Sequence, residues 1–365
     1  MNRGLTPFGY EQGSDPFCVI MAGGRGERLW PLVRANVPKV CVPVDGSRTL
    51  LETTLERLQA CVPDRQIRIV TTQGQDRPIR RILPSQFRGA LIVEPEPKNT
   101  AACILVAAAA LAEQDPDQVM AALPADHWIT PAAAFRRTFE AAVAAAREED
   151  ALVTIGLRPS HPHAGLGYLR PGQALSRRRG CRVFRLSRFI EKPSGGIARR
   201  LQQAGAYWNM GVFVARVSTM LDLYRRWLPE HAGALIPLGR WAGRHGFAAR
   251  AVKAYRSIRP VSFDEGIVAR AQSGLIIEGR FAWEDLGNWD SWTRISRLNT
   301  PPLSVASRNV RVVNADGHLI ATVGLQDAII VHTPDATLIC RPDQTQALRQ
   351  IVAQLAKQPS LARYR

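Results

Sequence analysis

FCVIMAGGRGERLWP, residues 17–31, is the stretch that decides the fold of this chain. It opens with an apolar run of strand length, and the glycine-rich segment 22–26 follows directly. Glycines let a backbone approach a ligand closely, and successive N–H groups can cradle phosphate oxygens. The spacing lacks the third glycine of a dinucleotide fingerprint and the Gly-Lys-Ser/Thr of a Walker A loop. Taken alone, the segment therefore predicts either a tight strand-to-helix turn or a phosphate-binding loop.

The same strand-then-helix order repeats along the first half of the chain. Thr49 and Glu52 have the spacing of a capping box, and Asn99 and Thr100 are candidate caps of an alanine-rich helix. The order indicates an α/β fold with a doubly wound, mostly parallel, Rossmann-like sheet. The predicted strands are residues 17–21, 67–71, 90–93, 119–123 and 151–156, and the predicted helices are residues 49–59, 99–113 and 131–147.

Polar or glycine-rich segments follow three of these predicted strands, after Met21, Val93 and Leu123. In such sheets, ligands bind outside the carboxyl ends of the strands. The three strand exits are therefore expected to face one crevice.

The predicted secondary structure changes near residue 299, from mixed helices and strands to short strands. A helix is predicted before this point, at residues 263–271, whereas residues 309–340 alternate short β-branched runs with turn residues. A last helix is predicted at residues 344–357. We expect an N-terminal extension (1–16), a catalytic α/β domain (17–299) and a small β-rich tail with a terminal helix (300–365).

The composition is that of a globular protein, with 46% hydrophobic and 22% charged residues. The longest apolar run, Ala101–Ala112, is too short to span a membrane, and residues 1–17 lack the apolar segment of a secretory signal. We therefore expect a cytoplasmic protein with no membrane partner. The six cysteines are spaced neither as a disulfide framework nor as a zinc site.

The net charge of +17 indicates an anionic partner. Nucleic-acid-binding proteins usually concentrate their charge in a stripe or tail, whereas arginine is spread along this chain, so we expect no nucleic acid partner. Only five of the 48 basic residues are lysines, and Lys39, Lys98 and Lys192 lie in polar segments assigned to the crevice. A lysine supplies a compact point charge that an arginine does not.

Two cations and two carboxylates are candidates for chemistry on a nucleotide. Arg28 and Lys39 follow the glycine segment, where they would neutralise a triphosphate and stabilise a leaving pyrophosphate. Asp126 lies at a predicted strand exit, and Asp285 lies in a tryptophan-rich segment. Proteins usually hold Mg²⁺ with one or two carboxylates plus substrate phosphates. Each aspartate by itself also fits a turn or a cap.

A second polar set consists of Glu191, Lys192 and Asn209. The Glu and Asn side chains suit sugar hydroxyls, and the lysine suits an anomeric phosphate. A salt-bridged hairpin explains the same residues equally well.

Aromatic residues and histidines leave similar alternatives. Trp283, Trp289 and Trp292 fit either sugar stacking or, more commonly, core packing. His161 and His163 fit a surface loop better than a metal pair.

Taken in order, these segments resemble the sugar-1-phosphate nucleotidylyltransferase family. The opening stretch followed by Pro38 and Lys39 is similar to the family signature, and Trp30–Pro31 resembles its mannose-1-phosphate guanylyltransferase branch. Residues 319–322 and 327–338 resemble the family's small β-helical tail. The other matching segments are Glu94–Pro95, Lys98–Ala101, Pro124–His127, Gly167–Tyr168, Phe189–Pro193, Trp208–Gly211 and Trp283–Trp289.

The resemblance implies an activity and a set of partners. The phosphate of mannose 1-phosphate attacks the α-phosphorus of GTP, and pyrophosphate leaves in line, with Mg²⁺ as the cofactor and GDP-mannose as the product. The implied partners are GTP and mannose 1-phosphate, and a homodimer is left open.

The resemblance also implies roles for individual residues. The implied catalytic residues are Arg28, Lys39, Asp126 and Asp285, of which Asp126 and Asp285 are the metal ligands. The implied nucleotide-binding residues are Ala22, Gly23, Gly24, Asn99 and Thr100. The implied sugar-phosphate-binding residues are Gly167, Glu191, Lys192 and Asn209.

The chain departs from the family pattern mainly on the sugar side. His163–Tyr168 stands where Glu-Thr-Gly-Tyr-Gly-Tyr is usual, and Met210 stands where serine is usual. One alternative is the same chemistry with another sugar 1-phosphate or nucleoside triphosphate. Another is a non-catalytic regulatory subunit that binds a nucleotide-sugar, which the intact cations and aspartates disfavour.

Overall fold

The computed structural model describes residues 10, 14–24, 26–44, 46–271, 274–295 and 300–365. Most of the predicted N-terminal extension lies outside these ranges, as do Arg25 of the glycine segment and the predicted domain boundary at residue 299. No helix of the described part combines the length and the apolar character that a membrane span needs.

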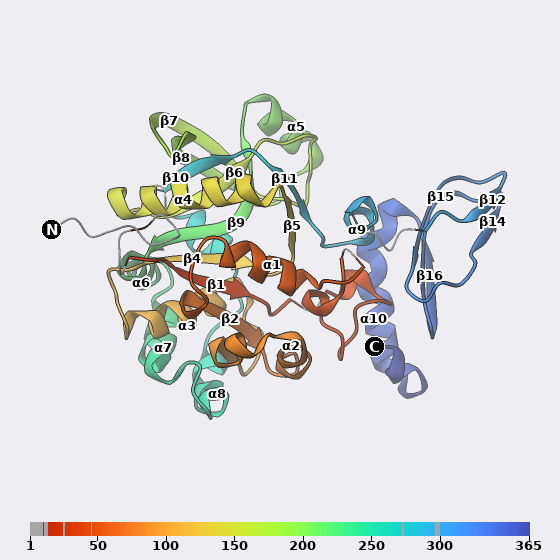
Figure 1. The fold of residues 1–365 in the computed structure, drawn as a ribbon, viewed down its shortest axis with the longest axis horizontal. Helices are drawn as coiled ribbons and strands as arrows, with labels where there is room; N and C mark the ends of the chain where they lie inside the picture. The colour runs from red at the N-terminus through yellow and green to blue at the C-terminus, as the bar shows by residue number, and fades with distance from the viewer. Residues whose placement is uncertain (1–9, 11–13, 25, 45, 272–273, 296–299) are drawn as a thin grey trace.

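A nine-stranded sheet forms the centre of the molecule, in the order β3-β2-β1-β4-β9-β6-β10-β8-β7 (Figure 1). Strands β3, β2, β1 and β4 are parallel to one another, and β6 and β10 form another parallel pair. The remaining strands, β7, β8 and β9, run antiparallel to their neighbours, and β9 separates β4 from β6. The predicted mostly parallel sheet is thus confirmed. The strands are β1 (Phe17–Met21), β2 (Ile67–Thr72), β3 (Leu91–Glu94), β4 (Val119–Pro124), β6 (Val153–Leu157), β7 (Tyr168–Arg178), β8 (Cys181–Ile190), β9 (Tyr207–Arg216) and β10 (Leu275–Gly279).

Helices cover both faces of this sheet, which confirms the doubly wound prediction. One apolar core lies under α3 (Asn99–Ala112), α6 (Val217–Trp227), α7 (Pro229–Leu235) and α8 (Phe247–Ser257). The opposite core lies under α1 (Leu50–Gln59), α2 (Asp76–Ile82) and α4 (Ala132–Glu149). A smaller cluster packs α5 (Gly195–Gln203) against Tyr168 and Trp208.

A two-stranded antiparallel sheet joins distant parts of the chain next to the central sheet. It pairs β5 (His127–Thr130) with β11 (Ala282–Asp285), and Asp285 lies opposite His127 in its register. Helix α9 (Trp289–Ile295) follows, and its Trp289 and Trp292 are fully buried, which confirms core packing for these two tryptophans. This pairing positions Asp285 beside the exit of β4.

The C-terminal tail forms a β-rich unit at one end of the molecule (Figure 1). Its strands are β12 (Leu303–Val305), β13 (Arg308–Asn314), β14 (Ala321–Val323), β15 (Gln326–Thr333) and β16 (Ala336–Cys340), and its helix is α10 (Leu348–Lys357). The Arg34 guanidinium binds the Asp335 carboxylate of the tail, and the Trp30 indole donates to the Tyr364 carbonyl at 2.7 Å. The tail is therefore fixed to the segment that follows the glycine loop.

Local predictions at helix ends are corrected by tertiary contacts. Asn99 and Thr100 do not cap α3 from outside, because the helix begins at Asn99, whose φ is +68°. The Thr100 hydroxyl instead accepts a hydrogen bond from the Phe263 N–H at 2.8 Å. Residues 263–271 form only a single π-helical turn, Asp264–Val268, and the last helix starts at Leu348 because a 3₁₀ segment with Pro342 precedes it.

Candidate active site

The exits of parallel strands β1, β3 and β4 line one cavity of about 240 Å³. Gly23 and Gly24 come from the loop after β1, and Asp126 follows β4. Asn99 and Thr100 begin helix α3 on the other side of the cavity. The predicted convergence of three strand exits on one crevice is therefore confirmed.

The glycines of the first loop differ in whether their backbone conformation or their packing excludes a side chain. Gly26 has φ +64°, and a Cβ there would lie 2.8 Å from Lys39 Cβ, so both conformation and packing require glycine. A Cβ on Gly24 would meet no atom within 4 Å among the described residues, and Gly23 has only ordinary contact with Thr72. Neither conformation nor packing within the chain therefore requires glycine at residue 24, which leaves room for a ligand beside its backbone.

Ala22 is placed differently from the two glycines that follow it. It is buried and does not line the cavity. Its N–H donates to the Val70 carbonyl at 2.7 Å, and its carbonyl accepts from the Thr71 hydroxyl at 3.0 Å. Both backbone groups of Ala22 thus bond within the protein.

Lys39, Asp126 and Asp285 meet at the mouth of this cavity. Lys39 Nζ lies 2.5 Å from Asp126 Oδ2 and 3.7 Å from Asp285 Oδ1, and Lys39 is only 5% exposed. Burial raises the pKa of Asp126, but the nearby charges of Lys39 and His127 outweigh it and hold that pKa below its usual value. Asp126 therefore stays ionised beside the buried Lys39 ammonium.

Arg28 approaches the same carboxylates from the glycine loop. A Cβ on Gly287 would lie 3.0 Å from the Arg28 guanidinium and 3.2 Å from the Asp285 carboxylate, so Gly287 leaves the space in which these two groups face each other. Burial lowers the pKa of Arg28, which Asp285 partly offsets. The Arg28 guanidinium also donates to Gln346 Oε1 of the tail at 3.2 Å.

His127 is buried beside the two aspartates. Its ring lies edge-on to Trp283, with the ring centroids 5.3 Å apart. Burial lowers the pKa of His127, although Asp126 and Asp285 oppose this shift. Burial therefore favours the neutral imidazole of His127 at this position.

Glu191 and Lys192 pair at the end of β8, on the far side of the crevice. The Lys192 ammonium contacts the Glu191 carboxylate, and Lys192 lines the larger cleft described below. A Cβ on Gly167 would lie 2.9 Å from Glu191 Oε2 and 2.8 Å from Phe189, so glycine permits this close approach.

Asn209 is buried, whereas Glu191 is half-buried and Lys192 is exposed. Its Nδ2 donates to Asp264 Oδ1 at 2.5 Å, and its Oδ1 accepts from the Thr154 hydroxyl at 3.0 Å. Burial raises the pKa of Asp264 to about 7, and the charge of Glu191 adds to the shift. Asn209 thus connects the half-buried Asp264 to the sheet, and Asp264 is a further polar group here that the sequence did not single out.

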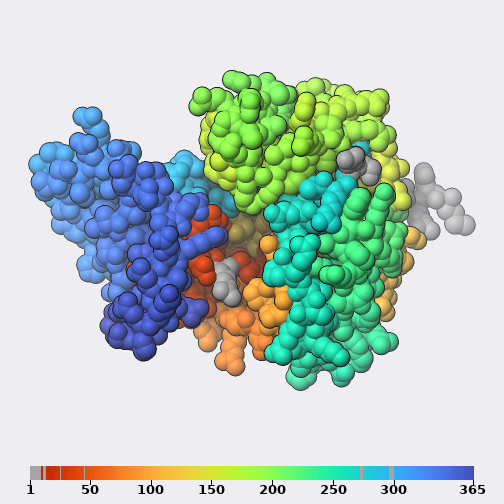
Figure 2. Space-filling model, turned by 180° about the vertical axis from the view of Figure 1, so that it is seen from behind, coloured from red at the N-terminus to blue at the C-terminus, as the bar shows by residue number. Residues whose placement is uncertain are grey.

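A second cleft of about 670 Å³ adjoins the first, and Asn99 and Thr100 line both. Figure 2 shows a hollow in the middle of one face, bounded by the tail in blue and by the β7–α5 region in yellow-green, with N-terminal residues in red at its floor. Arg28, Lys192 and Asp285 line this cleft. The structure thus brings two predicted catalytic residues and one predicted sugar-phosphate residue, Lys192, to one opening. The other predicted sugar-phosphate residues do not line it, namely Gly167, Glu191 and Asn209.

Several residues of this cleft were not assigned to it from the sequence. His161 and His163, predicted to lie on a surface loop, face the cleft beside Trp208, with ring centroids 5.1 Å and 6.5 Å from that indole. Gln346 and Arg349 reach the cleft from the tail. No local pattern could reveal these last two, because they lie near Arg28 only once the tail has docked.

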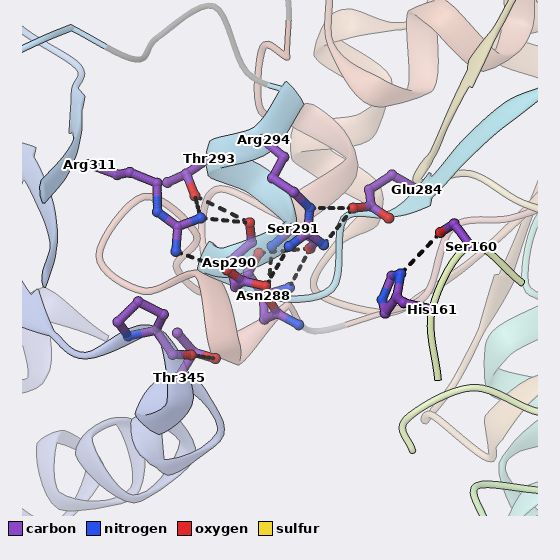
Figure 3. Close-up of polar contacts among 11 residues, drawn as sticks. Ser160, His161, Glu284, Asn288, Asp290, Ser291, Thr293, Arg294, Arg311 and Thr345 are labelled. Atoms are coloured by element: carbon purple, nitrogen blue, oxygen red, sulfur yellow. Dashed lines mark hydrogen bonds and ion pairs between the residues drawn. The ribbon is translucent and has the colours of Figure 1, made fainter. Parts of the chain in front are cut away.

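An ion-pair network supports the Asp285 side of the cleft (Figure 3). Arg294 lies between Glu284 and Asp290, and Arg311 of the tail binds Asp290 at 2.9 Å. Burial raises the pKa of Asp290, but hydrogen bonds from the two arginines outweigh it and lower that pKa overall. The tail therefore helps to fix the segment that carries Asp285.

Glu94 is a buried acidic residue that lines the smaller cavity. The sequence pointed to it only as part of the matching segment Glu94–Pro95. It lies at the end of β3, and its Oε1 accepts a hydrogen bond from the Tyr255 hydroxyl at 3.0 Å. Burial raises the pKa of Glu94 to about 8. A carboxyl group held in this way offers directional acceptors to a ligand in the cavity.

The geometry agrees with comparisons to known proteins. Residues 17–300 match the family described as Nucleotidyl transferase, which is more than half of the chain. The chain belongs to the nucleotidyl transferase family. Residues 303–355 of this nucleotidyltransferase match a second family, described as the MannoseP isomerase/GMP-like beta-helix domain.

Its relatives include mannose-1-phosphate guanylyltransferases. The Escherichia coli K12 enzyme of that name is 31% identical over 354 residues, covering 92% of this chain and 73% of the relative. The xanthan biosynthesis protein XanB of Xanthomonas campestris is 30% identical over 350 residues, covering 94% and 73% respectively. A crystal structure described as a mannose-1-phosphate geranyltransferase from Thermus thermophilus has a TM-score of 0.80 and 32% identity, covering 94% of this chain and 99% of that one. The chain is therefore an enzyme of the nucleotidyltransferase class.

Proposed function

We propose that this nucleotidyltransferase transfers GMP from GTP to mannose 1-phosphate, giving GDP-mannose and pyrophosphate. The observation that carries the proposal is the meeting of Lys39, Asp126 and Asp285 where the two cavities join. One cavity has the glycine loop and the other has Lys192, so a nucleotide and a sugar phosphate would approach the same charged centre. We place the reaction in the cytoplasm.

The reaction forms one P–O bond and breaks another. A phosphate oxygen of mannose 1-phosphate bonds to the α-phosphorus of GTP, and the bond to the bridging oxygen of the β-phosphate breaks. The leaving pyrophosphate carries that electron pair. Positioning and charge stabilisation supply most of the catalysis in such a transfer. Arg28 and Lys39 would stabilise the charge on the triphosphate, and Lys192 would hold the attacking phosphate.

The acceptor set fits Mg²⁺. The carboxylates of Asp126 and Asp285 both contact the Lys39 ammonium, so their oxygen atoms lie near each other. Oxygen is the ligand atom that Mg²⁺ prefers. When bound there with substrate phosphates, the ion would neutralise charge on the phosphates during transfer. Lys39 would hold the two carboxylates in place before the substrates arrive.

Glu94 supports guanine as the base. Guanine presents an N1–H and an N2 amino group on one edge, and a carboxylate can accept from both. Adenine, uracil and cytosine do not present this pair of adjacent donors. The pKa of Glu94 is about 8, so the carboxyl group would have to lose its proton when it binds guanine as a carboxylate below that pH. The KM for GTP should therefore fall as the pH rises from 6 to 8.

A pyrophosphate-release assay tests the proposed function. The panel pairs GTP, ATP, UTP, CTP and dTTP with the 1-phosphates of mannose, glucose and N-acetylglucosamine, with Mg²⁺ present and Asp285→Asn as the background control. Release confined to GTP with mannose 1-phosphate supports the proposal. Release with a different pair overturns the substrates and leaves the reaction class. Binding of GDP-mannose without any release overturns the catalytic proposal and favours a regulatory subunit.

A further inference from the structure

A cluster of two histidines and an aspartate lies in the tail, outside the candidate active site. Asp316 and His318 belong to the turn after β13, and His332 lies near the end of β15. Asp316 Oδ2 is 2.8 Å from His318 Nδ1 and 3.3 Å from His332 Nε2. One atom from each residue falls within 4.8 Å of the other two. Nothing in the nucleotidyl transfer proposed above uses these residues.

The spacing of these atoms suits a small divalent ion. Zinc binds imidazole nitrogen and carboxylate oxygen at about 2.0–2.2 Å, and tetrahedral geometry then separates its ligand atoms by about 3.3–3.6 Å. The 3.3 Å separation between Asp316 Oδ2 and His332 Nε2 falls in that range, whereas the 2.8 Å separation from His318 Nδ1 would have to lengthen by about 0.5 Å. His318 is 67% exposed and sits on a turn, so it can adjust, and solvent can reach the cluster.

His332 is oriented as metal-binding histidines usually are. Its Nδ1 lies 2.8 Å from the Thr337 hydroxyl, which fixes the ring and leaves Nε2 toward Asp316. The buried Nε2 atom makes no hydrogen bond within the described ranges of the chain. When the proton is on Nδ1, the Nε2 lone pair faces the Asp316 carboxylate, and the two repel each other electrostatically. A cation bound between them would attract both groups.

The turn that carries the other two ligands is itself held to β15. Asn314 lies opposite His332 in the parallel register of β13 and β15, and its Nδ2 donates to the His318 carbonyl. Three residues after His332, Asp335 binds Arg34 of the catalytic unit. The cluster therefore lies close to a contact that fixes the tail.

We propose that Asp316, His318 and His332 form a site for a divalent transition-metal ion of the Zn²⁺ type. Three protein ligands leave a fourth position for water or another donor. Nitrogen ligands distinguish this site from the all-oxygen pair Asp126 and Asp285, because imidazole favours zinc over magnesium. The bound ion would fasten the turn to β15 and stabilise the tail.

Calorimetric titration of the EDTA-treated 365-residue chain with ZnCl₂ tests the proposal. Excess Mg²⁺ is kept present to occupy the carboxylate site. Co²⁺ is added in a parallel titration, because its ligand-field absorption reports nitrogen and oxygen coordination. The expected result is one Zn²⁺ per chain, a Co²⁺ spectrum, and a thermal unfolding midpoint that rises with Zn²⁺.

Variants separate this site from other zinc-binding groups. His318→Ala lies on an exposed turn and should fold, yet lose at least about tenfold in Zn²⁺ affinity, and His332→Gln should do the same. His245→Ala, an exposed histidine of another loop, should bind as the unmodified protein does. No stoichiometric binding, or binding unchanged in His318→Ala and His332→Gln, overturns the site. Pyrophosphate release by His318→Ala stays unchanged under the proposal, so the outcome is independent of the proposed function.

Discussion

Lys39→Met removes the buried ammonium from between two carboxylates while keeping most of the side-chain volume. In the structure, this ammonium lies 2.5 Å from Asp126 and 3.7 Å from Asp285. The substitution leaves the two carboxylates near each other without that cation. It therefore asks whether Lys39 serves the reaction as well as the fold.

The magnitude follows from these distances. At an effective dielectric constant of about 20, unit charges at 2.5 Å and 3.7 Å attract by about 7 and about 4.5 kcal/mol. Desolvation of the lysine offsets most of this, and removing one partner of a fully buried pair costs about 3–5 kcal/mol. The Asp126 and Asp285 side chains are 26% and 40% exposed, so water screens them in part. We expect a loss of about 2 kcal/mol in the free energy of unfolding.

The effect on catalysis should be larger than the effect on stability. Loss of one charged contact to a transition state typically lowers the rate about 100- to 1000-fold, or about 2.7–4 kcal/mol. We expect kcat/KM for pyrophosphate release to fall by this amount. Mg²⁺ binding to the nucleotide-free variant should tighten, because Lys39 no longer competes for the two carboxylates.

The pH dependence of stability provides an internal check, measured in EDTA. The folded pKa of Asp126 lies below its usual value through Lys39 and His127, against the effect of burial. Its stabilising contribution is present above pH about 3.9 and is lost as the pH falls through the lowered value. The stability difference between the unmodified protein and Lys39→Met should thus be full at pH 7 and shrink below pH 4.

Urea unfolding, Mg²⁺ titration and pyrophosphate-release kinetics measure these effects. Lys253→Met, which changes an exposed lysine on α8, is the matched control and should behave as the unmodified protein. A kcat/KM within about threefold of that of the unmodified protein would refute the catalytic role of Lys39. Weaker Mg²⁺ binding in Lys39→Met would refute the idea that the lysine and the ion share the same carboxylates.

Four further substitutions test the rest of the site. Asp285→Asn should lower pyrophosphate release at least about 1000-fold while GTP still binds, and full turnover would remove Asp285 from the metal site. Lys192→Ala should raise the KM for the sugar phosphate about 10- to 100-fold with little change for GTP, and an unchanged KM would contradict its assignment. Glu94→Gln should reduce the preference for GTP over ATP in competition assays. Burial raises the folded pKa of Glu94 to about 8, so the unmodified protein loses stability as the pH rises toward 8 and this carboxyl group ionises. Glu94→Gln has no such group and should lose less stability than the unmodified protein between pH 5 and 9, as measured by urea unfolding. Gly167→Ala would place a Cβ 2.9 Å from Glu191, so it should raise the KM for the sugar phosphate and leave that for GTP unchanged, whereas equal effects on both would indicate general misfolding.

Local chemistry made several elements predictable. Thr49 and Glu52 predicted the start of α1, and the structure forms both hydrogen bonds of that capping box. The apolar runs of β1, β2, β3 and β4 stood out because strands buried on both faces have few polar positions.

Two helices outside these predictions, α2 and α8, differ in the strength of their local signal. Helix α2 has one fully buried residue, Ile79, and a proline inside it, so its periodicity is faint. Helix α8 does carry a buried stripe at helical spacing, Phe247, Ala251 and Tyr255, which could have revealed it.

Some residues of the candidate site could likewise be predicted from the sequence, whereas the positions of others depend on tertiary contacts. Arg28, Lys39, Asp126 and Asp285 could be chosen from residue type and their place after strands or glycines, and the structure brings these four side chains together. The exclusion of Ala22 from the cavity and the deep position of Asn209 depend on hydrogen bonds to Val70 and Asp264. The roles of all these residues stay predictions until the variants are measured.

By itself, the sequence determined the order of the first parallel strands and of helices α1, α3 and α4, the glycine loop, and the chemical types gathered at strand exits. These properties are local, since period, capping and turn chemistry act over a few residues. Only the tertiary structure decided that β9 lies antiparallel between β4 and β6, and that β11 pairs with β5 so that Asp285 reaches Lys39. It alone placed Asp316 and His318 against His332. Such meetings depend on which distant segments pair and in what register, and pairing is set by burial of whole faces rather than by any short stretch of residues.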